Sequence, residues 1–311
     1  MLYIFLFLWV FSAILIVLEQ GMTRTIIYLG IFSLITSLCF LFFSAPDVAM
    51  AEAAISTFST IFFIVCFEKY YSLRTRSDIE NNMASLGLKK IFTTYIIPLV
   101  FTVFLALIFI LHTPHAEANS YLKDQYTSMF SADIGGENVV TSIYLGYRMY
   151  DTLFEALMLL VSVIAVAHLS IFADFSVTDG KLSDITRSTI GSFTIRAICP
   201  VILLFGIYLI ANGHLTPGGG FQGGVALAAF FICRYLIYDI YDTKAEKIIR
   251  MEKIIFTAII LLPFLFIFLG LYYYYPQYRN AYLITMNALI GMKVCCGFII
   301  IFYRYIALEK R

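Results

Sequence analysis

Nine apolar runs, each about as long as a membrane-spanning helix, divide the sequence almost from end to end. A helix of about 20 apolar residues crosses the hydrocarbon core of a bilayer. Hydrophobic residues make up 61% of the 311-residue chain and charged residues only 13%, unlike a water-soluble domain. We therefore predict an all-α, polytopic membrane protein with about nine transmembrane helices. The runs cover residues 2–19, 24–43, 47–67, 91–111, 150–173, 194–213, 219–238, 254–274 and 281–303.

Basic residues gather in the segments that follow the third and the seventh run. Residues 68–90 hold five lysines and arginines, and residues 239–253 hold four. Because cytoplasmic loops of membrane proteins carry an excess of such residues, we expect both segments inside the cell. The N-terminus then lies outside and the C-terminus in the cytoplasm. The first run has no basic leader or small-residue cleavage site, so we expect a retained helix.

Charge and cysteine usage argue against several classes of protein. The formal net charge is +1 and the charges sit in a few loops, so we expect no nucleic-acid partner. The six cysteines lie in or beside apolar runs, without a Cys-x-x-Cys motif or a histidine at ligand spacing. We therefore expect no metal, no cofactor and no catalytic centre on this chain.

The stretch "SAPDVAMAEAAIS" places a carboxylate inside the third run. Pro46 and Asp47 suit the first turn of a helix and its positive dipole end. Glu52 lies deeper, on one face with Ser56 and Ser59, among alanines that allow another helix to approach. Carboxylates in apolar surroundings are costly and usually functional, which favours a proton or cation role. A structural ion pair or an interfacial position is the alternative.

Asp151 and Glu155 are spaced four apart, so they share a helix face near the start of the fifth run. Two carboxylates on one face can share or relay protons, because each raises the proton affinity of the other. The alternative is an outer helix end at which Arg148 pairs with Asp151.

Lys293 falls near the middle of the last run. A lysine at that depth extends toward the membrane surface, pairs with a carboxylate or loses its proton. We expect a pair, with Glu52, Asp151, Glu155 or a partner subunit supplying the carboxylate.

The glycine-rich stretch "HLTPGGGFQGG" joins the sixth and seventh runs. It lacks the GK[ST] ending of a phosphate-binding loop, and no strand is predicted before it. Five glycines within seven residues predict a close backbone approach to a neighbouring subunit or a water-lined cavity, and a plain hairpin is the alternative. The turn and packing residues that we select are Pro46, Asp47, His214, Pro217, Gly218, Gly219, Gly220 and Gln222.

Three stretches resemble, in order, three modules of one group of membrane complexes. "APDVAMAEAAIS" resembles the motif of the D-type subunit of membrane-bound hydrogenases, a module also found in the large Mrp antiporter subunit. "NVVTSIYLGYRMYDTLFEALMLLVSVIAV" resembles the E-type module, apart from Phe154 where the pattern has glycine, which we expect to change the packing beside Asp151 and Glu155. "FGIYLIANGHLTPGGGFQGGVALAA" and "LIGMKVCCG" resemble the B-type, MnhB-like subunit. We expect a D-type module over residues 1–90, an E-type module over 91–190 and a B-type module over 191–311.

The resemblance implies a subunit of a multisubunit assembly related to the membrane arm of respiratory complex I, in a prokaryotic cytoplasmic membrane. Its partners would be the bilayer and other Mrp-like, hydrogenase-like or complex I-like subunits. Glu52 matches the acidic residue of the D-type motif, and Asp151 and Glu155 match the acidic pair of the E-type motif. In the family these positions are linked to routes for H⁺ or Na⁺. A scaffold without an ion path is the alternative, and the lack of an internal repeat argues against a self-sufficient transporter.

Overall fold

The computed structural model describes residues 2–19, 21–71, 96–111, 120–172, 189–238, 245–270 and 274–307. Every regular element within these residues is helical, which confirms the all-α prediction. The elements are α1 (Leu2–Leu18), α2 (Met22–Phe42), α3 (Pro46–Tyr71), α6 (Ile97–Leu111), α7 (Ser120–Asp133), α8 (Val139–Ser142), the π-helical turn η2 (Ile143–Tyr147), α9 (Met149–Phe172), α10 (Thr189–Asn212), α11 (Gly220–Tyr238), α12 (Ala245–Phe268), the 3-10 turn η3 (Pro276–Tyr278) and α14 (Arg279–Ala307).

Six of the described helices contain a stretch long and apolar enough to cross a bilayer: α2, α3, α9, α10, α12 and α14. The apolar helices α1 and α11 and the apolar part of α6 are shorter. The chain is therefore a multi-pass membrane protein, and the count of nine spans stays a prediction.

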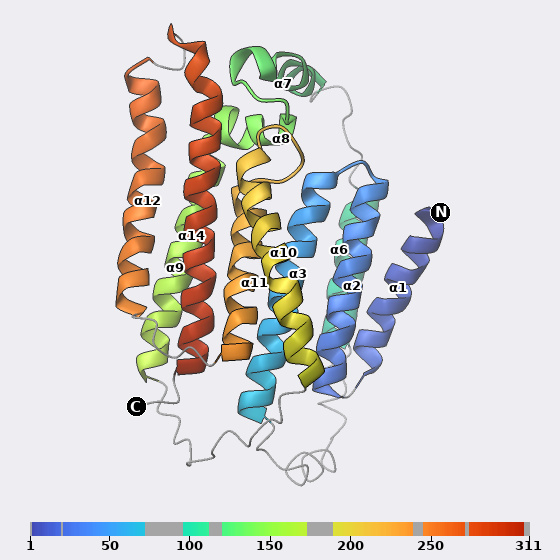
Figure 1. Cartoon of the computed structure of the whole chain (residues 1–311). Helices are drawn as coiled ribbons and strands as arrows, with labels where there is room; N and C mark the ends of the chain where they lie inside the picture. The colour runs from blue at the N-terminus through green and yellow to red at the C-terminus, as the bar shows by residue number, and fades with distance from the viewer. Residues whose placement is uncertain are drawn as a thin grey trace.

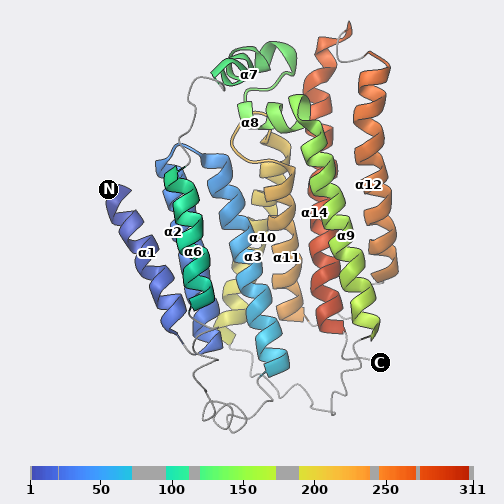
Figure 2. The ribbon, with the colours of Figure 1, turned by 180° about the vertical axis from the view of Figure 1, so that it is seen from behind.

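The long helices run side by side along one axis (Figures 1 and 2). Helices α1 to α3 form one side of the bundle, α9, α12 and α14 form the other, and α10 and α11 lie between them. Helix α11 contacts both α3 and α14, so it joins the two sides. The short helices α7 and α8 cover one end of the bundle, where the glycine-rich loop also lies.

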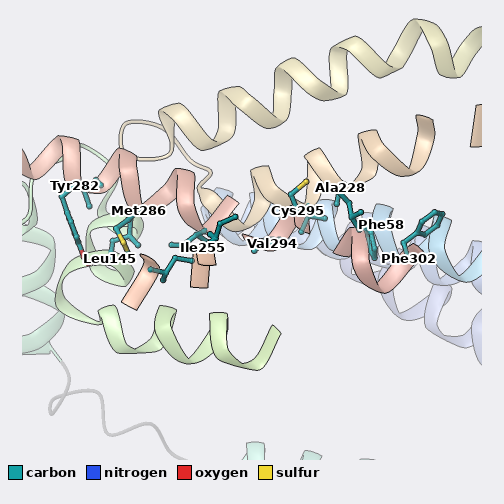
Figure 3. Packing of buried hydrophobic residues seen from close by; sticks show 14 of the residues in the cluster. Phe58, Leu145, Ala228, Ile255, Tyr282, Met286, Val294, Cys295 and Phe302 are labelled. Carbon is teal, nitrogen blue, oxygen red and sulfur yellow. Dashed lines mark hydrogen bonds between the residues drawn. The ribbon is translucent and has the colours of Figure 1, made fainter. Parts of the chain in front are cut away.

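The buried core follows α14 along most of its length (Figure 3). Val294 and Phe302 of α14 pack in one apolar cluster with Ala228 of α11 and Phe58 of α3. The helices approach closely because glycine lies between them. A Cβ atom on Gly224 would stand 2.5 Å from the carbonyl oxygen of Gly291, closer than real Cβ contacts.

Helix α12 begins at Ala245, well before the boundary of 254 that the apolar run predicts. We ended the charged loop at Lys253, because charged residues normally mark the end of a span. The helix continues through this charged segment because one of its carboxylates is paired inside the bundle. Helix α7 lies between α6 and α9 in the chain, and the short helix α8 follows it.

Candidate functional site

Three distant parts of the chain meet at one end of the bundle, in a cluster that we call the polar junction. It consists of Asp47 at the start of α3, Asn138 before α8, Thr141 in α8 and the loop of residues 213–220. The amide nitrogen Nδ2 of Asn138 donates to Asp47 Oδ1 over 3.1 Å and to the Thr216 carbonyl over 3.0 Å. The Oδ1 atom of Asn138 meanwhile caps α8 by accepting from backbone N–H groups. One amide side chain therefore links three segments.

The glycine-rich loop meets Asp47 through its backbone. The N–H group of Gly218 donates to Asp47 Oδ1 over 3.0 Å, and the Asp47 side chain is buried. Gly218 and Gly219 have φ angles of +145° and +150°, a region that favours glycine. A Cβ atom on Gly219 would also collide with the hydroxyl of Tyr144. The close approach predicted for this loop is thus made within the chain itself.

Asn287 of α14 extends the hydrogen bonds of the polar junction toward the interior of the bundle. Its Oδ1 atom accepts from the Tyr144 hydroxyl over 3.1 Å and from the Gly220 N–H over 3.2 Å. Burial raises the pKa of Tyr144 to about 12, so the hydroxyl stays protonated and is able to donate. The Nδ2 atom of Asn287 is buried without a hydrogen-bond partner among the described residues.

The other selected loop residues surround the junction. The carbonyl of His214 accepts from the N–H groups of Glu137 and Asn138, whereas its buried Nδ1 atom has no partner among the described residues. Gln222 Nε2 lies 3.5 Å from the Asp47 carbonyl, at the limit of a hydrogen bond. A pocket of about 410 Å³ opens beside the junction, and its walls include Pro46, Asp47, Glu137, Asn138 and Pro217.

Glu52 lies between α2 and α3 and is half-buried. Its Oε1 atom accepts a hydrogen bond from the hydroxyl of Ser33. One turn closer to the junction, the Ser37 hydroxyl donates to the Ala49 carbonyl over 2.7 Å. Ala49 therefore contacts α2, whereas Ala54 packs against the apolar cluster that includes residues of α11 and α14.

Asp151 and Glu155 lie on the outer surface of α9, and both are exposed in this chain. Arg148 Nη2 and Asp151 Oδ2 form an ion pair of 2.6 Å, so Asp151 has the partner foreseen in the alternative interpretation. Phe154 is 63% exposed. The effect of Phe154 on the packing beside the two carboxylates stays a prediction.

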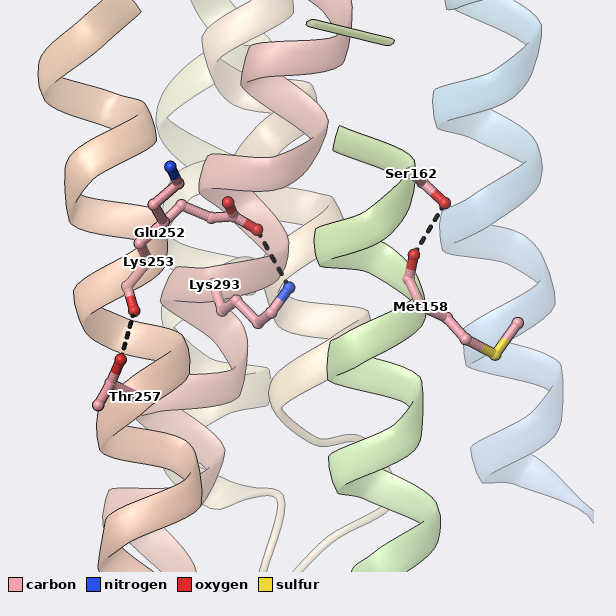
Figure 4. Close-up of polar contacts among 6 residues, drawn as sticks. All are labelled: Met158, Ser162, Glu252, Lys253, Thr257 and Lys293. Carbon is pink, nitrogen blue, oxygen red and sulfur yellow. Dashed lines mark hydrogen bonds and ion pairs between the residues drawn. The ribbon is translucent and has the colours of Figure 1, made fainter. Parts of the chain in front are cut away.

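Lys293 forms the carboxylate pair that we expected, but with a residue that we did not select. Its Nζ atom lies 3.2 Å from Glu252 Oε1 of α12, and the two side chains are 0% and 1% exposed (Figure 4). The ring of Phe256 also faces the ammonium, 5.7 Å from Nζ to the ring centroid. Glu155 interacts with Lys293 electrostatically without a direct contact.

Within the part of the chain that the structure describes, no direct bond joins the four ionisable residues that we selected. These residues are Glu52, Asp151, Glu155 and Lys293. They belong to α3, α9 and α14. From the sequence we did not select three residues that the structure places in these contacts, namely Asn138, Glu252 and Asn287. A signal existed for Asn138, which precedes a short helix as an N-cap residue does. Glu252 was hidden because it lies among the basic residues of a predicted loop.

Two segments of this chain match known protein families. Residues 190–309 match the domain related to the MnhB subunit of Na⁺/H⁺ antiporters, and residues 7–71 match the D-type subunit of MBH, the membrane-bound hydrogenase. The chain thus joins a segment similar to the MBH D-type subunit with a segment similar to MnhB-related domains, and we refer to it as the fusion. The fusion is also similar to putative antiporter subunits mnhA2 of Staphylococcus aureus strains JH9 and JH1, with 30% identity over 163 residues in each case. The match covers 51% of the fusion but only 19% of those relatives.

Two solved structures share the fold. The Mrp complex from Dietzia sp. DQ12-45-1b aligns with a TM-score of 0.71 at 18% identity, over 99% of the fusion and 35% of that chain. The membrane-bound sulfane sulfur reductase, an archaeal respiratory membrane complex, aligns with a TM-score of 0.57 at 24% identity. That alignment covers 70% of the fusion and 98% of the matched chain. Both structures are of complexes, and the second is a respiratory membrane complex.

Proposed function

We propose that the fusion is a membrane subunit of a multisubunit, Mrp-like cation/proton antiporter module and contributes a path for H⁺ or Na⁺. The module is either a stand-alone antiporter or part of a redox-driven, hydrogenase-like or complex I-like assembly. The observation that carries the proposal is Lys293, a fully buried lysine in a membrane helix that is paired with a buried carboxylate. Ionisable residues inside membrane bundles are costly and generally mark ion or proton routes.

The proposal includes a topology and three modules. The chain crosses a prokaryotic cytoplasmic membrane about nine times, with the N-terminus outside and the C-terminus inside. Residues 1–90, 91–190 and 191–311 form the D-type, E-type and B-type modules. Support comes from the two family matches at the two ends of the chain and from the distribution of basic residues.

The path uses Glu52, Asp151, Glu155 and Lys293. Glu52 can exchange a proton or cation between α2 and α3, because its carboxylate is only half-buried there. Glu155 connects the interior to the outside of the bundle, since it is exposed on α9 and interacts electrostatically with Lys293. No cofactor is needed on this chain, and partner subunits supply the energy.

The outer face of α9 contacts a partner subunit in this proposal. A carboxylate that faces the lipid of a membrane costs several kcal/mol, roughly 2.5–3.5 kcal/mol on insertion scales. Glu155 is exposed in this chain, beside the exposed Phe154 and Met158. Another membrane subunit that donates a hydrogen bond or a positive charge to Glu155 removes this cost. The two similar solved structures are both complexes, which supports a partner on this face.

The alternative is an architectural subunit with no ion path of its own. The polar junction favours this reading, because Asp47, Asn138 and Gly218 hold three segments together without using any of the four path residues. The two functions differ in what the carboxylates do once the complex has assembled.

The experiment is a triple variant, Glu52→Gln, Asp151→Asn and Glu155→Gln, expressed with its partner subunits. The yield of intact complex and the cation and proton flux per complex in proteoliposomes are measured separately. The exposed Asp124→Asn on α7 is the control, because it removes a carboxylate outside the path. The proposal expects near-normal yield and lost flux. Lost yield with normal flux in the remaining complex supports the architectural function instead.

A further inference from the structure

Glu252 and Lys293 form a buried pair whose hydrogen-bonding capacity is largely unused. A lysine ammonium has three N–H donors, and only one bond, to Glu252 Oε1, is made among the described residues. The second carboxylate oxygen, Oε2, is buried and has no hydrogen-bond partner there. The side of the ammonium that faces Phe256 meets only an aromatic ring.

We expect a buried ion pair that only holds two helices together to have its remaining hydrogen-bonding groups satisfied. The cost of desolvating two charges is repaid when additional hydrogen bonds satisfy the remaining lone pairs and protons, and the described residues make no such bonds to this pair. In a medium of low dielectric constant, transfer of the proton from ammonium to carboxylate converts two buried charges into two neutral groups. The open lone pairs of Oε2 then allow the acid to form an O–H bond on either oxygen.

The surroundings of the pair contain few other ionisable groups. Those that interact with it electrostatically are Glu155 from α9, Cys296 on α14 and Lys253 beside Glu252. Glu252 lies about two turns from the start of α12, at the end of the bundle opposite the polar junction (Figure 1). The pair thus lies between the exposed carboxylate of α9 and that opposite end.

We propose that Glu252 and Lys293 together form a proton-relay site in the MnhB-related segment. An N–H bond of the Lys293 ammonium breaks, its electron pair stays on nitrogen, and an O–H bond forms on Glu252. The neutral amine accepts the next proton from the side of Glu155, and Glu252 releases its proton toward the start of α12. The internal transfer leaves the pair with no net charge, uptake of the next proton by the amine makes it +1, and release from Glu252 restores the starting charge. The relay rests on the proposed function, because it requires that protons cross this subunit.

The test replaces both partners together, as Glu252→Leu with Lys293→Met, in the complete complex. Replacing a buried ion pair with apolar residues of similar size is generally tolerated, because no charge is left alone. We expect normal assembly and a proton flux per complex in proteoliposomes that falls by roughly tenfold or more, since the proton-carrying groups are gone. Wild-type flux in the assembled double variant would overturn the relay.

Glu252→Gln provides a second variant in case the double variant does not assemble. The glutamine keeps the size of Glu252 but cannot bind a proton, and Lys293 avoids an unpaired buried charge by staying a neutral amine hydrogen-bonded to the amide, so we expect assembly and loss of flux. Full flux in this variant overturns the relay as well. Glu52→Gln, measured in the same vesicles, distinguishes a failure of the relay from a failure of the proposed function. If Glu52→Gln loses flux while the Glu252 variants keep it, only the relay fails, whereas normal flux in Glu52→Gln contradicts the proposed function.

Discussion

Asn138 donates a hydrogen bond to Asp47 across 3.1 Å, although 91 positions separate the two residues in the chain. The same carboxylate oxygen accepts from the N–H of Gly218. Asp47 lies in the segment that matches the D-type MBH family and Gly218 in the segment related to MnhB. A single carboxylate therefore fixes the two segments relative to each other, with Asn138 between them.

Replacing Asp47 tests the polar junction. Asp47→Ala leaves the Gly218 N–H unpaired in a buried site, at a cost of about 1–3 kcal/mol, and removes one acceptor of the Asn138 amide, which keeps its bond to the Thr216 carbonyl. We expect a lower melting temperature and a lower yield of assembled complex. Asp47→Asn keeps a side-chain oxygen as acceptor and should retain most of the stability. Equal melting temperatures for Asp47→Ala and the wild type would show that the junction does not hold the segments together.

Replacing a junction glycine tests the close approach of α11 to α14. A Cβ atom on Gly220 would stand 2.5 Å from the backbone oxygen of Asn287, and backbone cannot move aside easily. We expect Gly220→Ala to destabilise the complex by about 1–3 kcal/mol, the usual cost of overpacking. Gly297→Ala on α14 is the matched control. Its Cβ atom would meet only side-chain atoms of Leu159 and Val163, at 3.2–3.3 Å, so a much smaller effect is expected in thermal melts.

Local sequence signals predicted where α3 begins and indicated close backbone packing in the glycine-rich loop. Proline followed by aspartate suits a helix start for reasons that involve only the nearest residues, and Pro46 and Asp47 do begin α3. The density of glycine indicated a close backbone approach, which residues 218–220 make within this chain, whereas the predicted approach to a neighbouring subunit or a water-lined cavity stays a prediction. Each of these conclusions depends on neighbours in the chain, which a sequence displays directly.

The same local signals could not predict which distant residues pair. Nothing near Lys293 distinguishes Glu252 from the carboxylates at 52, 151 or 155, because the choice depends on α12 packing against α14. A hydropathy boundary also placed Glu252 in a loop, since a charge normally ends a span unless a distant residue neutralises it. Likewise, Asn138 is visible as a helix cap, but its bonds to Asp47 and Thr216 follow from the tertiary arrangement alone.

Cysteine cross-linking tests the contact of α9 with a partner subunit. Met158 is 71% exposed on α9, two residues after the buried Ala156. We expect Met158→Cys, labelled with benzophenone-maleimide, to give a photo-cross-linked product with another subunit in native membranes, because the benzophenone inserts into C–H bonds and needs no partner thiol. Val163→Cys is the control on the same helix, because Val163 is 1% exposed and faces the interior. A Met158→Cys variant that remains uncross-linked in the assembled complex would contradict a subunit on this face.

The central claim is that ionisable residues of this chain carry H⁺ or Na⁺, and Glu52→Gln tests it most directly. Glutamine keeps the shape of the side chain and can still accept a hydrogen bond from Ser33, so the complex should assemble normally. The measurement is ion flux per assembled complex in proteoliposomes, with Asp124→Asn as the control. We predict that flux falls by roughly tenfold or more, because glutamine neither binds a proton nor attracts a cation. Wild-type flux in the assembled Glu52→Gln complex would contradict the claim.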